Sequence, residues 1–232
     1  MSCLGVDGAK SGWIGVWRQG GAFDFEVYPD AVSLQADRTA AAVIAVDVPI
    51  GLAEAGSRTA DREARCFVGG RRACSVFSAP VRGILDAATQ PEASRRHREI
   101  DGRGFGAQAF GILAKVREWD ALLQSSPRAR AQVREVHPEV SFAALNGGIG
   151  VADRKKSERG QAARLHLLGA VFDPAAILRL LDAVPRRSAA ADDVLDALVA
   201  LWTAERIAAG TAHSLPSPPE IDRCGLQRAI WY

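Results

Sequence analysis

The sequence lacks the features that would direct it to a membrane or to an oxidising compartment. Its four cysteines form no Cys-x-x-Cys pair, so neither a zinc ribbon nor a disulfide framework is indicated. Its most apolar run, from Ala40 to Ala53, is interrupted by Asp47 and is too short to span a bilayer. No basic segment followed by an apolar one opens the chain. We therefore expect a soluble, cytoplasmic protein with reduced thiols and no membrane partner.

The chain also lacks an excess of charge of either sign. Its 29 Lys and Arg residues against 27 Asp and Glu residues give a formal net charge of +2, which excludes a generic polycation. Lysine is scarce, with only four residues, so arginine supplies most of the positive charge. At 232 residues, 48% of them hydrophobic, the chain can build one substantial core. We predict a single domain over residues 1–232.

The chain begins with two apolar runs joined by a tight turn, and a lone acid lies near the end of the first run. Leu4 and Val6 precede Asp7, a run of small residues follows, and the second apolar run begins at Trp13. This pattern predicts two strands with Asp7 near the end of the first. A carboxylate beside a buried strand is costly unless it meets a metal, a cation or several N–H donors. The alternative is that Asp7 caps the turn.

The next segments predict the rest of a mixed sheet. Residues 22–28 alternate apolar and acidic side chains, which is typical of a half-exposed antiparallel strand. A short helix is expected over residues 29–38. The apolar stretch that follows, over residues 41–52, predicts a parallel strand buried on both faces. This strand ends at a second lone acid, Asp47. The sequence therefore predicts an α/β fold whose central sheet combines a three-strand antiparallel meander with parallel strands and is flanked by helices.

A third acid at a strand end and an acidic helix follow later in the chain. A strand from Gln132 ends in His-Pro-Glu, which places Glu139 at the start of a helix. A long helix over residues 188–209 carries Asp192, Asp193 and Asp196 on one arc. The helix dipole and a Ser188 cap could account for the first two of these acids, whereas the apolar neighbours of Asp196 predict that it points inward. Further helices are expected over residues 105–123, 161–169 and 173–181, and after an extended spacer at 215–219 the apolar tail is expected to dock as an edge strand.

A locally basic insertion is predicted over about residues 54–104. From Glu54 to Arg103 it holds ten arginines against seven acids and no lysine. One interpretation is a solvated pair of helices with internal ion pairs. The other is an arm that faces phosphate, because the guanidinium fork suits phosphate oxygens. On the second interpretation the candidate nucleic-acid contacts are Arg62, Arg65, Arg71 and Arg82, joined by Lys155 and Lys156 from a polar loop.

Several different short motifs follow one another along nearly the whole chain. Their order and number carry more information than any one of them. They are Gly5-Val6-Asp7-Gly8 with Trp13, Val46-Asp47-Val48-Pro49-Ile50-Gly51-Leu52, Arg71 to Arg82 with Ser75-Val76-Phe77 and Pro80, His137-Pro138-Glu139 with Phe142, Lys155-Lys156 with Gly160, and Asp192-Asp193 with Asp196-Ala197.

With these motifs the chain resembles the family catalogued as domain of unknown function 429, whose members are predicted nucleases of the ribonuclease H-like fold. The stretches Leu4 to Asp7 and Asp193 to Ala197 also look like those of Holliday-junction resolvases of the RuvC type. The resemblance implies a ribonuclease H-like fold and a hydrolase that acts on phosphodiester bonds. A nucleic acid would be the partner, with DNA or RNA, and a homodimer, left open.

The chemistry that such acids support is two-metal hydrolysis of phosphodiester bonds. Two divalent ions about 3.5–4 Å apart can activate water and stabilise the leaving oxygen when carboxylates from different elements converge. Hard oxygen ligands favour Mg²⁺ or Mn²⁺ over zinc. We expect Asp7 to bridge the two ions and Asp47 to bind one of them. Asp193 or Asp196 would bind the other.

Two further residues complete this hypothesis, and one departure qualifies it. Glu139 would be a fourth ligand or would orient the attacking water, and Lys155 or Lys156 would stabilise phosphate charge. The strand-four acid is the shorter Asp47, where many such nucleases have Glu. A non-catalytic ribonuclease H-fold protein that binds nucleic acid is the first alternative. A phosphoryl-transfer enzyme of the actin-like ATPase or sugar kinase type is the second, although it needs two such lobes and the chain has room for one.

Overall fold

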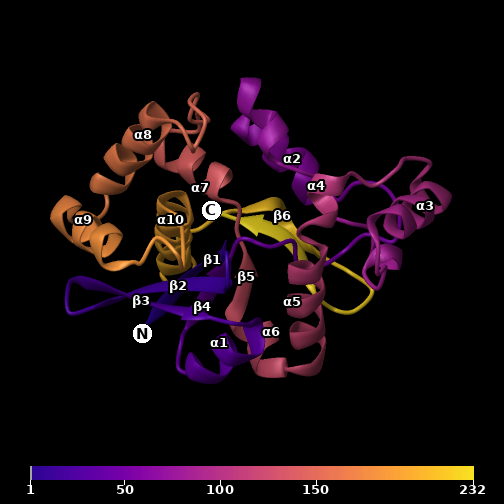
Figure 1. Ribbon diagram of the computed structural model, residues 1–232, viewed down its shortest axis with the longest axis horizontal. Coiled ribbons are helices and arrows are strands. Elements are labelled where there is room, and N and C mark those ends of the chain that lie inside the picture. The colour runs from indigo at the N-terminus through magenta and orange to yellow at the C-terminus, as the bar shows by residue number, and fades with distance from the viewer. Residues whose placement is uncertain (1) are drawn as a thin grey trace.

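A five-stranded mixed sheet forms the centre of the computed structural model, which describes residues 2–232 apart from the side chain of Arg71 (Figure 1). The strand order is β3-β2-β1-β4-β5. The first three strands form an antiparallel meander, and β4 and β5 run parallel to β1. The α/β class and the mixed sheet flanked by helices are thereby confirmed. The strand bounds are β1 Cys3–Ala9, β2 Gly12–Gln19, β3 Ala22–Tyr28, β4 Val43–Val46 and β5 Val133–Glu135.

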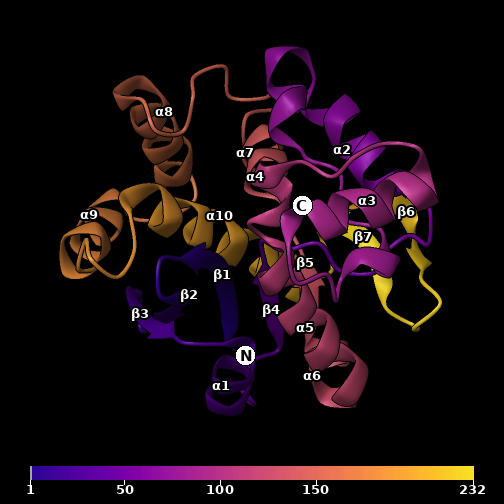
Figure 2. The same ribbon diagram turned by 45° about the vertical axis from the view of Figure 1, so that its right-hand side comes forward.

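Helices cover both faces of this sheet (Figures 1 and 2). On one face α10, Ala191–Ala208, packs across β1 and β4, and α8 (Glu158–Gly169) and α9 (Pro174–Ala183) share its apolar cluster. On the other face lie α1, Ala31–Asp37, and α5, Leu113–Ser125. The central strands are therefore buried on both sides, which is why β4 is wholly apolar, whereas the edge strand β3 stays partly exposed.

Alternation along β1 decides which side chains meet α10. Leu4 and Val6 belong to the cluster on the α5 face, so Gly5 and Asp7 face α10. A Cβ atom at Gly5 would overlap the backbone of Ala197 and Leu201 in α10. Only glycine allows the helix to approach this closely, and that approach carries the acidic first turns of α10 to the end of β1.

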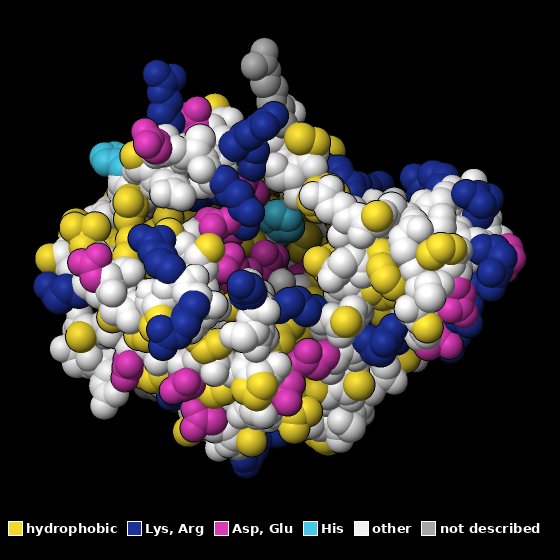
Figure 3. Space-filling model, viewed as in Figure 1, with side chains coloured by type: hydrophobic (Ala, Val, Ile, Leu, Met, Phe, Trp, Pro, Cys, Tyr) yellow, Lys and Arg dark blue, Asp and Glu magenta, His cyan; other side chains and the backbone are white. Residues whose placement is uncertain are grey.

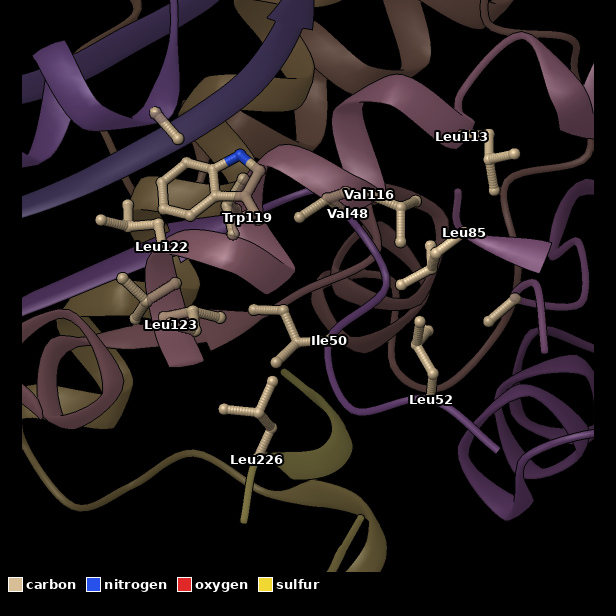
Figure 4. Packing of buried hydrophobic residues seen from close by; sticks show 14 of the residues in the cluster. Val48, Ile50, Leu52, Leu85, Leu113, Val116, Trp119, Leu122, Leu123 and Leu226 are labelled. Atoms are coloured by element: carbon tan, nitrogen blue, oxygen red, sulfur yellow. The ribbon is translucent and has the colours of Figure 1, made fainter. Parts of the chain in front are cut away.

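The cluster on the α5 face contains the largest buried rings. Trp13 of β2 meets Trp119 of α5 edge to face, with ring centroids 5.6 Å apart. Around Trp119, Figure 4 shows Val116 and Leu122 from α5 together with Val48 and other residues of the segment after β4. This packing fixes the segment that follows Asp47, so the position of that acid is set by the core.

The remaining elements complete the fold around the sheet. β6 and β7 form a hairpin against α2, and Trp231 of β7 makes a parallel bridge to Val136 beyond the end of β5. No helix among residues 2–232 is both long and apolar enough to cross a membrane. The bounds are α2 Thr59–Val68, two 3-10 segments at Gly70–Ser75 and Arg82–Ile84, α3 Gln90–Asp101, α4 Ala107–Phe110, α6 Pro127–Gln132, α7 Pro138–Leu145, β6 Ser214–Ile221 and β7 Gln227–Trp231.

Three local predictions need correction. The helix expected over residues 105–123 is two helices, α4 and α5, separated at Gly111 and Ile112. The spacer expected at 215–219 lies within β6, because the hairpin with β7 gives this proline-rich segment a partner strand. The predicted cap of α10 was also wrong, because the helix begins at Ala191, after Ala190 rather than Ser188, and the Asp193 side chain accepts the Ala190 N–H at 2.9 Å.

Candidate functional site

Two acids lie side by side where the parallel pairing of β1 with β4 ends. Val6 of β1 is paired with Val46 of β4, so the next residues, Asp7 and Asp47, occupy equivalent positions there, although β1 itself continues to Ala9. The backbone N–H of Asp47 donates to the Val6 carbonyl at 3.0 Å, which holds this register one residue beyond β4. The Asp7 side chain acts on the pKa of Asp47, and the charge of Asp47 acts on that of Asp7. The two acids therefore lie close enough to be coupled electrostatically.

A third acid reaches the same place from α10. Asp196 lies on the helix face turned to β1, one residue before Ala197, whose backbone packs against Gly5. Asp7 and Asp196 are buried, with 7% and 2% of their surface exposed. The negative charge of Asp196 acts on Asp7 more strongly than that of Asp47. Three carboxyl groups from three elements thus converge.

Crowding and burial change how these carboxyls ionise. Burial, followed by the charges of Asp196 and Asp47, raises the pKa of Asp7 well above its ordinary value. Burial likewise raises the pKa of Asp47 and that of Asp196, each to about 6, against the lowering effect of Lys155. Groups with such shifts cluster at functional sites.

Lys155 supplies the opposing charge. It comes from the loop before α8, and its Nζ lies 2.7 Å from Oδ2 of Asp196 and 3.7 Å from Oδ2 of Asp192. Burial lowers the pKa of Lys155, but the charges of the surrounding acids outweigh that effect and raise it above the ordinary value. The lysine is charged at neutral pH and neutralises part of the acidic cluster.

Glu139 lies near the cluster but is engaged elsewhere. Its Oε1 accepts hydrogen bonds from Arg72 at 2.6 Å and from Arg164 at 2.7 Å. Its Oε2 is buried and has no hydrogen-bond partner among the side chains that the structure describes. The charge of Glu139 raises the pKa of Asp47 and of Asp196, so it acts on the site electrostatically even while it is paired with two arginines.

One face of the molecule has a hollow with acidic side chains at its bottom. Figure 3 shows acidic side chains and a histidine at the bottom of a depression near the middle of one face, with lysine and arginine side chains around it. In the matching view of Figure 1 this depression lies between the side of α7 and α8 and that of α2. An anionic ligand that approached this face would meet positive charge before it reached the acids.

Other residues singled out from the sequence lie farther from the acids or are engaged in other contacts. Asp193 caps α10 and adds only a smaller effect to the pKa of Asp7. Arg82 is 3.0 Å from Asp120 and 2.5 Å from Asp222, in a nearly buried network. Arg65 donates to the Val76 carbonyl and the Ser78 hydroxyl.

Three of the predicted nucleic-acid contacts remain to be placed. Arg62 is exposed and bonds the Ser57 carbonyl and the Thr59 hydroxyl. Lys156 is exposed beside Lys155. The side chain of Arg71 lies outside the described residues, so the prediction for it stays a prediction.

Sequence reasoning missed a lysine and two arginines at this site. Lys115 of α5 donates to the carbonyls of Gly12 and Ala9 and stacks over the Trp13 ring at 4.1 Å. The charge of Asp7 acts on it. Lys115 was the only lysine within a predicted helix, which was the available signal. Nothing in the sequence distinguishes Arg72 and Arg164, the partners of Glu139, from the many other arginines.

The carboxylate donors suit a hard divalent cation, although the described side chains form no preorganised metal site. Among residues 2–232 no three His, Cys, Asp or Glu side chains form a group that could hold a metal ion as they stand. Carboxylate oxygens are nevertheless the ligands that Mg²⁺ and Mn²⁺ prefer. The mutual repulsion of Asp7, Asp47 and Asp196, with the unpartnered Oε2 of Glu139, is relieved by positive charge. A divalent ion would join or replace Lys155 as their counter-charge.

Comparison with known proteins places the chain in one family. A family model described as "Protein of unknown function (DUF429)" matches residues 5–221. That span includes all the acids of the site. No curated protein and no solved structure matches the chain.

Proposed function

The chain belongs to the family described as Protein of unknown function (DUF429), and we propose that it is a metal-dependent nuclease that hydrolyses phosphodiester bonds. The observation that carries the proposal is the meeting of Asp7, Asp47 and Asp196 from two strand ends and a helix. Carboxylates from different elements that share one place are what a two-metal site requires. The basic rim around the hollow suits a polyanionic substrate.

The sheet topology supports the same proposal. A meander of three antiparallel strands, then two parallel strands on the β1 side, with a helix packed across the first strand, is the arrangement expected of a ribonuclease H-like fold. In this proposal β1 and β4 present the acids at their carboxyl ends, and α10 brings Asp196 to them. Fold alone does not determine activity, so the site carries the argument.

Each residue near the acids would have a distinct part. Asp7, Asp47 and Asp196 would hold Mg²⁺ or Mn²⁺, which when bound supplies an activated water and stabilises the leaving oxygen. Lys155 would then be free to neutralise phosphate charge, since the ions would take over its present role. Oε2 of Glu139 would orient water, because this buried oxygen has no other partner.

The substrate contacts would come from exposed cations. Lys156 and Arg62 are exposed and pair with no carboxylate among the described residues, so they can contact phosphates. We leave Arg82 out of the proposed interface, because its guanidinium is bound by two carboxylates. Arg72 would act indirectly, by fixing Glu139.

The test is cleavage of a panel of labelled single-stranded, duplex and branched DNA and RNA with Mg²⁺, with Mn²⁺, or with EDTA. We expect cleavage only with metal, and a loss of several orders of magnitude in Asp7→Asn, because the amide keeps the shape but not the charge. Asp182→Asn is the matched control, since Asp182 is exposed on α9. An Asp7→Asn protein that cleaves as fast as its parent would overturn the proposal.

A non-catalytic nucleic-acid-binding protein is the second candidate, and one observation favours it. Lys155 forms an ion pair with Asp196, so the chain itself supplies part of the charge that balances the acids. If the protein binds labelled nucleic acid but cleaves none of the panel with either metal, this second function replaces the first.

A further inference from the structure

A second hollow lies at the edge of the sheet, apart from the acidic cluster. It has a volume of about 370 Å³ and lies between β5, α6 and β7. The bridge from Val136 to Trp231 joins the two strands at one end, and the cavity fills the space where they are not paired. Its apolar lining includes Ile50, Leu123, Leu226 and Ala229.

Two arginines without acidic partners border this cavity. Arg134 of β5 uses Nη1 for the carbonyls of Val133 and Arg130, which leaves its Nε and Nη2 without an acceptor among the described residues. Arg130 of α6 bonds the carbonyls of Leu123 and Gln124 through Nε and Nη2, and its Nη1 is likewise unpaired. Neither takes part in an ion pair within residues 2–232, in contrast to Arg58 or Arg82.

The charge of Arg134 is therefore uncompensated inside a partly buried setting. Burial lowers its pKa, and no neighbouring acid opposes that effect. One carboxylate does line the cavity, that of Glu135, but both of its oxygens accept hydrogen bonds from Arg58. The net charge presented to a ligand is positive.

Two residues of β7 also line the cavity, Trp231 and Gln227. Among the described residues, the indole N–H of Trp231 and Oε1 of Gln227 are buried without a hydrogen-bond partner. Neither atom is accessible from the cavity as these side chains stand, so the lining on this side presents the ring of Trp231 and the stem of Gln227.

We propose that this cavity binds a small organic anion, an aromatic or heteroaromatic ring that carries one phosphate or carboxylate group. The anionic group would lie against Arg134 and Arg130, whose guanidinium forks match either oxyanion. The ring would lie on the apolar lining, against the side chains of Trp231 and Gln227. The volume falls within the range of small-molecule sites. This site uses none of the residues of the proposed nuclease.

Isothermal titration calorimetry of the full chain tests this site with four probes. They are adenosine 5′-monophosphate, 1-naphthoate, inorganic phosphate and uncharged 1-naphthol. We expect one or both of the ring-bearing anions to bind at least about tenfold more tightly than inorganic phosphate and naphthol, because each of those lacks one half of the recognition. The two ring-bearing anions distinguish phosphate from carboxylate as the preferred group. A shift of the Trp231 indole N–H resonance on titration would place the ligand in the cavity.

Matched variants assign the binding. Arg134→Gln should weaken binding about tenfold or more, as loss of a charge-assisted bidentate contact does. Arg128→Gln, on the exposed side of α6, should leave it unchanged. Ala131→Trp should fill part of the cavity without removing charge and should also abolish binding. This second variant tests the site even if Arg134→Gln destabilises the protein. The proposal is wrong if neither ring-bearing anion binds, if inorganic phosphate binds as tightly, or if both cavity variants bind like the parent.

Discussion

The ammonium group of Lys155 lies 2.7 Å from the carboxylate of Asp196, across a sequence separation of 41 residues. The lysine belongs to the loop before α8 and the acid to α10, so only the folded chain brings them together. Around them, Asp7 and Asp47 raise the cost of concentrating negative charge. Lys155 is therefore a cation within the chain that permits three carboxyls, two of them buried, to share one place.

Lys155→Met should destabilise the metal-free protein, and more at pH 8 than at pH 5. Removing one partner of a fully buried ion pair costs about 3–5 kcal/mol. Because the Lys155 side chain is 38% exposed, we expect about 1–2 kcal/mol at pH 8. At pH 5 the acids with a raised pKa are protonated and need less compensation. Urea unfolding with EDTA at both pH values measures the difference.

Lys156→Met is the matched control, since its exposed side chain should change stability little. Added Mn²⁺ should stabilise Lys155→Met at pH 8 more than it stabilises the parent, because the ion competes with no lysine there. Equal losses at pH 5 and pH 8 would mean that Lys155 does not compensate the acids.

Asp47→Asn should make the metal-free protein relatively more stable as the pH rises. Folding raises the pKa of Asp47 from 3.8 to about 6, so the folded state holds the proton more tightly and stability falls as pH rises through this window. The asparagine does not titrate. Relative to the parent, the variant should gain about 1–3 kcal/mol between pH 4 and pH 7.

Urea unfolding with EDTA at intervals across that range measures the gain. Asp182→Asn, which changes an exposed acid of α9, should track the parent at every pH. If the Asp47→Asn curve also runs parallel to the parent's, Asp47 is not strained by its neighbours and the acids do not form a coupled cluster.

Gly5→Ala should be strongly destabilising although it adds a single methyl group. The new Cβ would overlap the backbone of Ala197 and Leu201, so α10 would have to move away from β1. Overpacking costs about 1–3 kcal/mol and more when backbone is the obstacle. The melting temperature of Gly8→Ala gives the comparison, because its Cβ would meet only the flexible end of Lys115 at 3.1 Å. Equal melting temperatures for the two variants would refute this account of helix packing.

The meander and β4 were predictable because their signals are local. Alternation over residues 22–28 and the apolar run before Asp47 each depend on neighbours in sequence. The partners of the acids were not predictable in this way. That Lys155 meets Asp196, or that Glu139 is bound by Arg164, depends on loops and on how closely α10 approaches Gly5. Arginines in particular are alike in sequence, and only packing separates Arg82 in its ion pairs from Arg62 in solvent.

The last prediction concerns nucleic-acid binding and compares an exposed cation with one held in ion pairs. If Lys156 contacts a phosphate, Lys156→Gln should weaken binding to every sequence. A plot of log binding constant against log salt concentration has a negative slope. For duplex DNA this slope should become shallower by about 0.9, the effect of one lost contact. Filter binding between low and moderate salt, with Asp7→Asn as the parent so that no cleavage occurs, measures this slope.

Arg82→Gln should behave in the opposite way. Its guanidinium bridges Asp120 and Asp222, so the loss should lower the melting temperature and leave the salt slope unchanged. The contrast matters because both residues add one positive charge, and a diffuse effect of net charge would move both slopes equally. A salt slope that falls for Arg82→Gln but not for Lys156→Gln would reverse the assignment of the interface. Equal slopes for the parent and both variants would remove Lys156 from it.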